Sequence, residues 1–137
     1  VMIDMDKFKE INDTHGHAAG DHLLKAFADC VRITLRKTDL PFRYGGDEFV
    51  IALPQTSSAM AQQCVQKLRS AFATVDFSSA IANLDHAPTL SIGVVERSKQ
   101  HGVLTLQNLL AAADLALYDA KAANRNCVRI YTPPQAA

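Results

Sequence analysis

The sequence predicts one α/β domain of the α+β type, in which a central mixed or antiparallel sheet is flanked by helices. The chain has 137 residues, of which 48% are hydrophobic, so it can bury one core but is too short for two domains. Its apolar spacing switches between that of strands and that of helices in the order β-α-β-β-α-β-α-β. This order indicates an antiparallel or mixed sheet with helices on one or both faces.

Each element is predicted from the spacing of its apolar residues and from the residues that bound it. The expected elements are a strand at 1–5, a helical turn at 7–12, a helix at 21–37, a hairpin of 42–44 and 49–53, a helix at 57–74, a strand at 89–95, a helix at 106–123 and a strand at 128–131. Residues 77–84 fit neither pattern, and 132–137 are expected to form a C-terminal tail after the fold ends.

The three long helices each carry an apolar stripe at three- and four-residue spacing. The stripes are Leu24, Phe27, Val31 and Leu35, then Met60, Cys64, Leu68 and Phe72, and finally Leu109, Ala113, Ala116 and Leu117. Asp21 near the start of the first helix suits the helix dipole, and Pro41 ends that helix. In the hairpin, Gly45 and Gly46 are expected to form a tight turn.

Charge and cysteine content exclude several classes of protein. Fourteen basic and fourteen acidic residues give a formal net charge of zero, which argues against a general nucleic-acid binder. No apolar run is long enough to span a bilayer and no secretory signal is present, so we expect a cytoplasmic domain, although the whole protein can still be membrane-anchored. Cys30, Cys64 and Cys127 are expected to be buried thiols in a reducing compartment, with no disulfide or zinc site.

Two acidic segments are candidates for chemistry. Asp4-Met5-Asp6 ends a strand, and Asp47-Glu48 follows the glycine pair. Carboxylates at a strand end and on a neighbouring hairpin can converge, and such oxygen ligands suit Mg²⁺ that also binds substrate phosphates. The alternative is that these acids are simply solvated at strand ends and turns.

Several separated motifs resemble those of the GGDEF domain of diguanylate cyclases. They are Asp4-Met5-Asp6-Lys7-Phe8-Lys9-Glu10-Ile11-Asn12-Asp13, Gly16-His17, Gly20-Asp21, Arg43-Tyr44-Gly45-Gly46-Asp47-Glu48-Phe49, Ser91-Ile92-Gly93, residues 114–121 and Asn124-Arg125-Asn126. A single such pentapeptide is weak, but these motifs occur in the family's order and cover nearly the whole chain.

The resemblance implies the synthesis of cyclic di-GMP from two GTP, with release of two pyrophosphates. It implies a fold like the palm of class III nucleotide cyclases and a cofactor of Mg²⁺ or Mn²⁺, with two ions in each active site. Each domain of the family holds one GTP, so a homodimer is needed for catalysis. A sensory or regulatory domain usually lies upstream.

The resemblance also implies roles for individual residues around the triphosphate. Asp4, the carbonyl of Met5 and Asp47 correspond to metal ligands. Asp47 and Glu48 are the catalytic carboxylates, with Asp47 the candidate base for the 3′-hydroxyl and the role of Glu48 not separable from it.

The phosphates themselves are expected to meet main-chain amides and two cations. The amides around Phe8 and Lys9 are expected to cradle the β- and γ-phosphates. Lys121 and Arg125 lie four residues apart, on one helix face, and can reach the same triphosphate. The alternative for this pair is that both are cations favoured by the helix dipole. The family usually has glycine at the position of Asn124, and asparagine tolerates the same left-handed backbone.

The guanine base is expected to contact Asn12 and Asp21, and His17 is expected to line the nucleotide site. An aspartate accepts hydrogen bonds from the guanine edge that adenine lacks, so Asp21 would discriminate against ATP. Gly45 and Gly46 would let the nucleotide lie against the hairpin backbone. The alternatives are a helix-terminal acid for Asp21, a solvent-facing histidine for His17 and a plain turn for the glycines.

A second site is expected at Arg36 and Asp39, whose spacing and distance from Gly45 match the family's inhibitory product-binding site. Arginine pairs well with guanine O6 and N7. The alternative is an ordinary charged helix end.

The family's domain normally begins with a helix carrying an Asp-x-Leu-Thr-x-Leu-x-Asn-Arg segment, which this sequence lacks. We therefore expect residues 1–137 to be a GGDEF-type domain truncated at its N-terminus, with the activity of the fragment alone left open. Two rival functions remain: a catalytically inactive domain that binds cyclic di-GMP or GTP, and a module that only dimerises.

Overall fold

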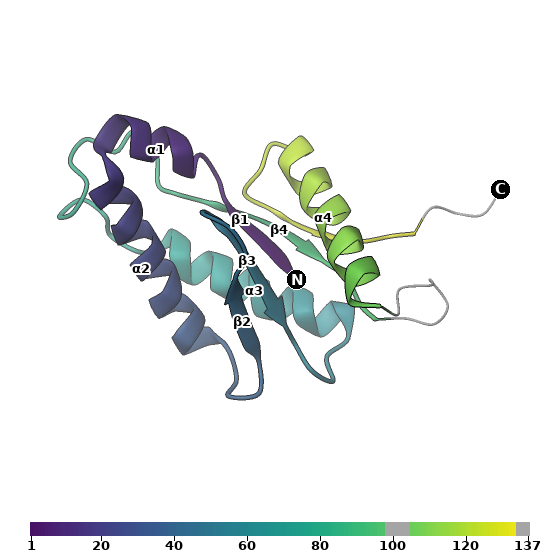
Figure 1. Cartoon of the computed structure of the whole chain (residues 1–137). Helices are drawn as coiled ribbons and strands as arrows, with labels where there is room; N and C mark the ends of the chain where they lie inside the picture. The colour runs from purple at the N-terminus through teal and green to yellow at the C-terminus, as the bar shows by residue number, and fades with distance from the viewer. Residues whose placement is uncertain (98–104, 134–137) are drawn as a thin grey trace.

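The computed structural model describes residues 1–97 and 105–133, which form five strands and four helices (Figure 1). In chain order they are β1 (Met2–Met5), α1 (Phe8–His15), α2 (His17–Thr34), β2 (Leu40–Arg43), β3 (Glu48–Ala52), α3 (Ser58–Ala73), β4 (Leu90–Val94), α4 (Leu106–Ala122) and β5 (Val128–Ile130). The predicted order of elements is confirmed, and the helical turn expected after the first strand is a helix of 8 residues. Of the expected C-terminal tail, residues 134–137 lie outside the described part of the chain.

The sheet is mixed, one of the two arrangements that the sequence left open, and β1 lies at its centre. The strand order is β2-β3-β1-β4-β5. Strand β1 is antiparallel to both of its neighbours, β3 and β4, whereas β4 and β5 are parallel. Helix α4 connects the two parallel strands, which is the kind of crossover that parallel pairing requires.

Helices cover both faces of this sheet. Ile3 and Met5 belong to the core formed with α2 and α3, whereas Met2 packs against Ala113 and Leu117 of α4. Because side chains alternate along a strand, Asp4 lies on the same face of β1 as Met2. The alternation therefore directs Asp4 toward α4 and away from the main core.

The inward faces of the helices differ in part from the predicted stripes. Buried residues are Leu23, Phe27, Cys30 and Val31 in α2, Ala61, Val65, Leu68 and Phe72 in α3, and Ala112, Ala113, Ala116, Leu117 and Ala120 in α4. Leu24, Leu35, Cys64 and Leu109 are only half-buried, and Met60 is exposed. Some buried positions therefore lie one residue away from the predicted ones. Neighbouring positions are both apolar there, and packing against the sheet decides which of the two is buried.

Helix α2 begins earlier than predicted. Its first residue is His17, so Asp21 lies in its second turn and is not a helix-terminal acid. Gly16 lies between α1 and α2, and its amide donates to the carbonyl of Asn12 at the end of α1. Its φ of 85°, which glycine adopts readily, turns the chain so that α2 begins at the next residue. The helix also ends earlier, at Thr34, so Arg36 follows the helix and lies in a turn.

The hairpin differs from a tight glycine turn. Residues 44–47 form an open loop between β2 and β3, and neither Gly45 nor Gly46 adopts a positive φ. Pro41 lies inside β2, which is an edge strand and so tolerates a residue without an amide hydrogen.

Residues 77–84, which fitted neither pattern in the sequence, contain no helix or strand. Cys30 is buried as predicted, but Cys127 is only half-buried.

Within residues 1–97 and 105–133, no helix combines the length and the apolar character needed to cross a bilayer.

Gly93 marks a close approach of α4 to β4. A Cβ atom at this position would collide with the carbonyl oxygen of Ala113 and the amide nitrogen of Leu117. Both are main-chain atoms of a packed helix, so they cannot turn aside as a side chain can. The lack of a side chain at Gly93 therefore sets how near α4 lies to the sheet.

We predict that Gly93→Ala lowers the free energy of unfolding by about 1–3 kcal/mol, because the added methyl group overpacks this contact. Urea unfolding followed by circular dichroism measures the change. Gly46→Ala is the matched control, since a Cβ atom there would have no atom within 4 Å. Equal stability of the two variants would mean that α4 can shift away from β4 at little cost.

Candidate active site

The strand register brings the two acidic segments together. Asp4 of β1 is paired with Glu48 of β3, and the amide of Met5 donates to the carbonyl of Asp47 at 3.1 Å. The end of β1 therefore lies beside the start of β3. The carboxylates converge, as expected, because β1 and β3 are antiparallel. Asp4 lies near the C-terminal end of β1 and Glu48 is the first residue of β3, so the two meet at the same edge of the sheet.

Asp4 is a buried carboxylate that has one cationic partner among residues 1–97 and 105–133. The ammonium group of Lys121, in the last turn of α4, donates to Asp4 Oδ2 at 2.7 Å. Burial raises the pKa of Asp4 above its ordinary value, and Lys121 opposes the rise. The negative charges of Asp47 and Asp6 raise it further. Such a carboxylate is stabilised in its ionised form by an added cation.

The donor set fits a divalent metal that is shared with a substrate. Among the described residues, no three acidic, histidine or cysteine side chains are grouped closely enough to hold a metal alone. Asp4, Asp47 and the carbonyl of Met5 supply hard oxygen atoms. Mg²⁺ commonly binds through one or two carboxylates and completes its shell with phosphates and water. The residues present therefore fit the ion that the sequence predicts.

Asp6, two residues beyond Asp4, has a different role. Its carboxylate accepts hydrogen bonds from Ser91 Oγ at 2.6 Å, Thr89 Oγ1 at 2.7 Å and the amide of Asn126 at 3.1 Å. These three hydrogen bonds hold the Asp6 carboxylate in place within the fold. Sequence reasoning assigned Asp6 no role of its own. The available signal was the pair of hydroxyl residues, two apart, in an otherwise apolar strand.

Helix α1 presents its N-terminus near the end of β1. Phe8 and Lys9 form its first turn, Phe8 half-buried and Lys9 exposed, and no side chain caps it. Lys7 precedes it with a left-handed φ of 60°. Amides in the first turn of a helix lack acceptors within that helix and can bind an anion. This geometry is compatible with the expected phosphate contacts.

Asn12 carries a buried polar atom without a partner. Its Oδ1 is buried but makes no hydrogen bond within the described part of the chain. Gly20 of α2 lies against it, and a Cβ atom at Gly20 would collide with that oxygen. A buried polar group without a hydrogen bond costs about 1–3 kcal/mol, which a ligand donor would recover.

The other residues expected at the base lie on the neighbouring helix. Asp21 directly follows Gly20, and its side chain is exposed. His17, the exposed first residue of α2, is four positions earlier and so lies on the same side of the helix as Asp21. Helices α1 and α2 thus bring to one region the two residues expected to contact the base, Asn12 and Asp21, and His17, which is expected to line the nucleotide site.

The loop of Gly45 and Gly46 is held by Arg43. Its guanidinium donates to the carbonyl of Gly46 at 2.7 Å from Nη2, and its Nε donates to Gly45 at 3.1 Å. The amides of Tyr44 and Gly45 both donate to the carbonyl of Glu48. Arg43 lies in the motif that suggested the family, but its role in ordering the loop was not predicted.

Lys121 and Arg125 do not share a helix face, contrary to the prediction. Helix α4 ends at Ala122, so only Lys121 is helical. Arg125 follows in a left-handed turn with a φ of 62°. Asn124 adopts a φ of 69°, the left-handed backbone that its place in the motif predicts. The chain reverses toward β5 here, and that reversal removes Arg125 from the helix.

Arg36 and Asp39 form a closed turn between α2 and β2. The amide of Arg36 donates to Asp39 Oδ2 at 2.8 Å, and the amide of Asp39 donates back to the carbonyl of Arg36 at 3.0 Å. Asp39 is buried, whereas the Arg36 side chain is exposed. The turn precedes β2, and the loop of Gly45 and Gly46 follows it, so the two sites lie at opposite ends of that strand.

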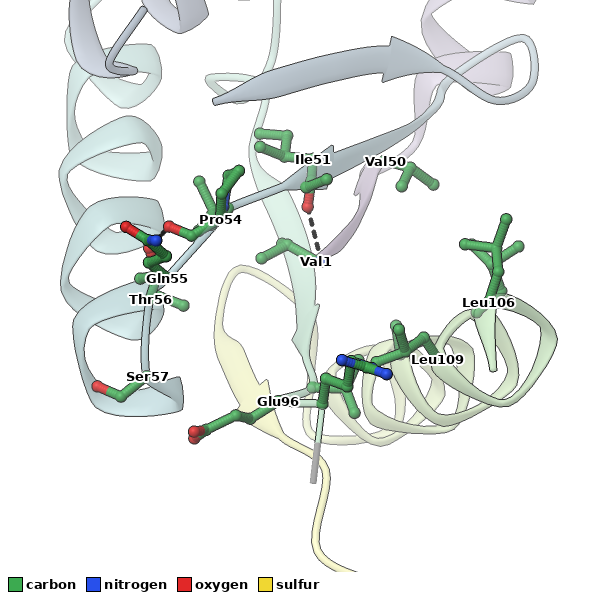
Figure 2. Close-up of a pocket in the computed structure, with 17 residues that line it drawn as sticks. Val1, Val50, Ile51, Pro54, Gln55, Thr56, Ser57, Glu96, Leu106 and Leu109 are labelled. Carbon is green, nitrogen blue, oxygen red and sulfur yellow. Dashed lines mark hydrogen bonds between the residues drawn. The ribbon is translucent and has the colours of Figure 1, made fainter. Parts of the chain in front are cut away.

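A hollow of about 560 Å³ lies elsewhere, beside Val1 at the start of β1, whereas Asp4 lies near the end of that strand. Figure 2 shows the residues that line it. It is lined mainly by apolar residues from β3, the segment after it and the first half of α4, including Val50, Leu106 and Leu109. The amine of Val1 donates to the carbonyl of Ile51 at its edge. This hollow contains none of the predicted site residues.

Comparison with known proteins points to one family. The family model described as diguanylate cyclase, GGDEF domain, matches residues 1–127. The response regulator PleD of Caulobacter vibrioides is 40% identical over 128 residues, which are 93% of this chain and 28% of that protein. The diguanylate cyclase DosC of Escherichia coli is 38% identical over 131 residues, 96% of this chain and 28% of that protein. The chain thus spans little more than a quarter of these relatives.

Solved structures give the same result. The GGDEF domain of DgcB from Caulobacter crescentus in complex with c-di-GMP superposes with a TM-score of 0.85 at 28% identity, covering 95% of this chain and 75% of that one. The active GGEEF domain of a diguanylate cyclase from Vibrio cholerae has a TM-score of 0.84 at 31% identity, covering 96% of this chain and 80% of that one.

Proposed function

The chain belongs to the GGDEF domain family of diguanylate cyclases, and on that premise we propose that it condenses two GTP into cyclic di-GMP and two pyrophosphates. The observation that carries the proposal is the register of β1 and β3, which sets Asp4 beside Glu48 with Asp47 next to it. Phosphoryl transfer needs carboxylates that can hold metal ions and a cation for the phosphates, and Asp4, Asp47, Glu48 and Lys121 supply these groups.

Asp4, Asp47 and the carbonyl of Met5 would hold Mg²⁺ or Mn²⁺, two ions in each site. When bound, these ions would neutralise charge on the phosphates and make the α-phosphate more electrophilic. Lys121 now forms an ion pair with Asp4, and we propose that it turns to the triphosphate when nucleotide and metal enter. Arg125 would add a second cation, and the amides around Phe8 and Lys9 would bind the outer phosphates.

Asp47 is proposed as the base. It would accept the proton of the 3′-hydroxyl, whose oxygen then forms a bond to the α-phosphorus of a second GTP. The bond from that phosphorus to the β-phosphate oxygen breaks, and pyrophosphate leaves. Glu48 is proposed as the second catalytic carboxylate. Each chain would hold one GTP, so two chains must face one another as a homodimer.

Guanine selectivity is proposed to come from Asn12 and Asp21, with His17 lining the site beside the backbone of Gly45 and Gly46. The unpartnered Oδ1 of Asn12 supports this, because guanine offers amino and imino donors to such an acceptor. The carboxylate of Asp21 would accept from the same edge of the base.

Product inhibition is proposed at Arg36 and Asp39. The internal hydrogen bonds of that turn hold Asp39 in place and leave the Arg36 guanidinium exposed for a guanine edge. The rival proposal is a catalytically inactive domain that binds cyclic di-GMP or GTP, and it would use the same turn of Arg36 and Asp39 for binding. The presence of Asp4, Asp47 and Glu48 together favours catalysis.

We also propose that the chain is the cyclase part of a longer cytoplasmic or membrane-anchored protein with a sensory or regulatory domain upstream. The support is its small share of the relatives' lengths. Incubation of the purified protein with GTP and Mg²⁺, followed by chromatography for cyclic di-GMP and pyrophosphate, tests the central proposal. Binding of cyclic di-GMP without any synthesis would favour the inactive domain.

We predict that Asp47→Asn reduces the rate of cyclic di-GMP synthesis by at least about 100-fold, because a metal ligand and the base are lost together. The thermal midpoint should stay close to that of the unaltered protein. Asp114→Asn is the matched control, because it makes the same replacement of a carboxylate by an amide at an exposed position of α4. Near-normal turnover in Asp47→Asn would remove Asp47 from the mechanism.

We predict that Asp21→Ala raises the apparent KM for GTP and erodes discrimination against ATP by about 10–100-fold, since a hydrogen bond to a charged group contributes about 1.5–3 kcal/mol. Competition assays with the two nucleotides measure it. Asp13→Ala removes an exposed carboxylate from α1, next to Asn12, and serves as the control. If Asp21→Ala still rejects ATP fully, the base is recognised by other residues.

We predict that Arg36→Ala weakens binding of cyclic di-GMP by about 1–3 kcal/mol, the scale of a bidentate arginine–guanine contact. Turnover at low product should change little, because the turn lies apart from the carboxylates. Calorimetric titration of cyclic di-GMP measures the affinity, with Lys37→Ala as the neighbouring exposed control. Equal affinities for wild type and Arg36→Ala would exclude Arg36 from product binding.

A further inference from the structure

The loop that carries Arg125 has an unusual backbone. Asn124, Arg125 and Asn126 have φ values of 69°, 62° and 47°, so three consecutive residues other than glycine are left-handed. This conformation costs about 1–2 kcal/mol for an ordinary L-residue and somewhat less for asparagine. Such strain persists only where surrounding contacts fix it, and it is found mainly at functional sites.

One side of this loop is fixed by Asp6. Its carboxylate accepts a hydrogen bond from the amide of Asn126 at 3.1 Å, and the same group accepts from Ser91 Oγ on β4 and from Thr89 Oγ1 just before that strand. Asp6 and Ser91 are both buried. The acceptor for Asn126 is thus a buried carboxylate that follows the last residue of β1 and is held by side chains of β4 and the residue before it.

The other side is fixed by Arg69 of α3. Its Nη1 donates to both the carbonyl oxygen of Asn126 at 2.9 Å and Asn126 Oδ1 at 2.8 Å. Its Nε also donates to Gln66 Oε1 at 3.0 Å, a contact within α3 that does not involve Asn126. Asn126 is therefore held through its amide, its carbonyl and its side chain. The amide of Arg125 also donates to the carbonyl of Ala120 at 3.1 Å, tying the loop to α4.

We propose that Asp6 and Arg69, joined through Asn126, are positioning residues that set Arg125 and the end of α4 for the outer phosphates of the nucleotide. We call these three residues the Asn126 clamp. The inference rests on the proposed function, in which Lys121 and Arg125 bind the triphosphate. The clamp acts on Arg125 through the backbone, because Asp6 and Arg69 bond neighbouring Asn126 and have no assigned contact with the nucleotide.

A clamp of this kind predicts a selective loss. If it only stabilised the fold, its removal would weaken every ligand of the site alike. If it sets Arg125, removal should weaken a nucleotide with three phosphates and spare one with a single phosphate, because the base is held by α1 and α2. Arg69 is the better residue to change, since it is only half-buried whereas Asp6 is buried.

The test is calorimetric titration of 3′-deoxy-GTP, which lacks the attacking hydroxyl, and of GMP, both with Mg²⁺. Arg69→Gln should raise the Kd for 3′-deoxy-GTP about fivefold and change that for GMP less than about twofold, the scale of one or two net hydrogen bonds. Gln66→Ala, which keeps the Asn126 contacts, should change neither Kd. Arg69→Lys should recover part of the loss, and Asp6→Ala should repeat it, where the variant folds.

Unchanged binding of 3′-deoxy-GTP in Arg69→Gln, or an equal loss for both nucleotides, overturns the clamp. A wild type that prefers 3′-deoxy-GTP no more than GMP overturns the clamp together with the proposed phosphate site. A wild type that keeps the selective response but makes no cyclic di-GMP from GTP overturns only the proposed activity. The two proposals therefore fail in distinguishable ways.

Discussion

The antiparallel pairing of β1 with both of its neighbours is the constraint on which the rest of the structure depends. It sets Met2 opposite Val50 and Gly93, which places α4 on one face, and it sets Asp4 opposite Glu48 and Ser91 at the end of the sheet. A shift of one residue would turn Asp4 toward the apolar core and bring Ile3 to the α4 face. The same register thus satisfies the core and collects the carboxylates.

Two aspartates of one segment illustrate how environment separates chemistry from structure. Asp4 and Asp6 are similarly hidden, with 8% and 5% of their surface exposed. Asp6 accepts hydrogen bonds from two hydroxyl groups and an amide, whereas Asp4 pairs with one half-buried lysine and has a raised pKa. A carboxylate with such a partner can exchange it for a metal ion, while one bonded to three fixed donors holds the fold.

The candidate site contains several features that do not serve stability. Asn12 has a buried oxygen without a partner, Lys7 precedes α1 in a left-handed conformation, and three left-handed residues follow α4. Each is unfavourable by itself. Lys7, Asn124 and Arg125 line one hollow together with Asp6, and Asn12 belongs to the helix that Lys7 precedes. Their concentration in one region is typical of a site that a ligand completes, because strain and unpaired groups are tolerated where binding requires them.

From the sequence alone we could predict a mixed or antiparallel sheet, the order of its elements and the convergence of the acidic segments, because hydrophobic periodicity and acids at strand ends are local properties. Phe27, Leu68 and Leu117 were placed correctly in the core for the same reason. Only the tertiary structure decided which apolar neighbour turns inward, Leu23 or Leu24, where α2 begins, and that Arg125 leaves the helix. Those outcomes depend on partners far along the chain: Asp6 bonds residues 85 and 120 positions away. Local spacing carries no information about such partners, because packing selects them only when distant segments meet.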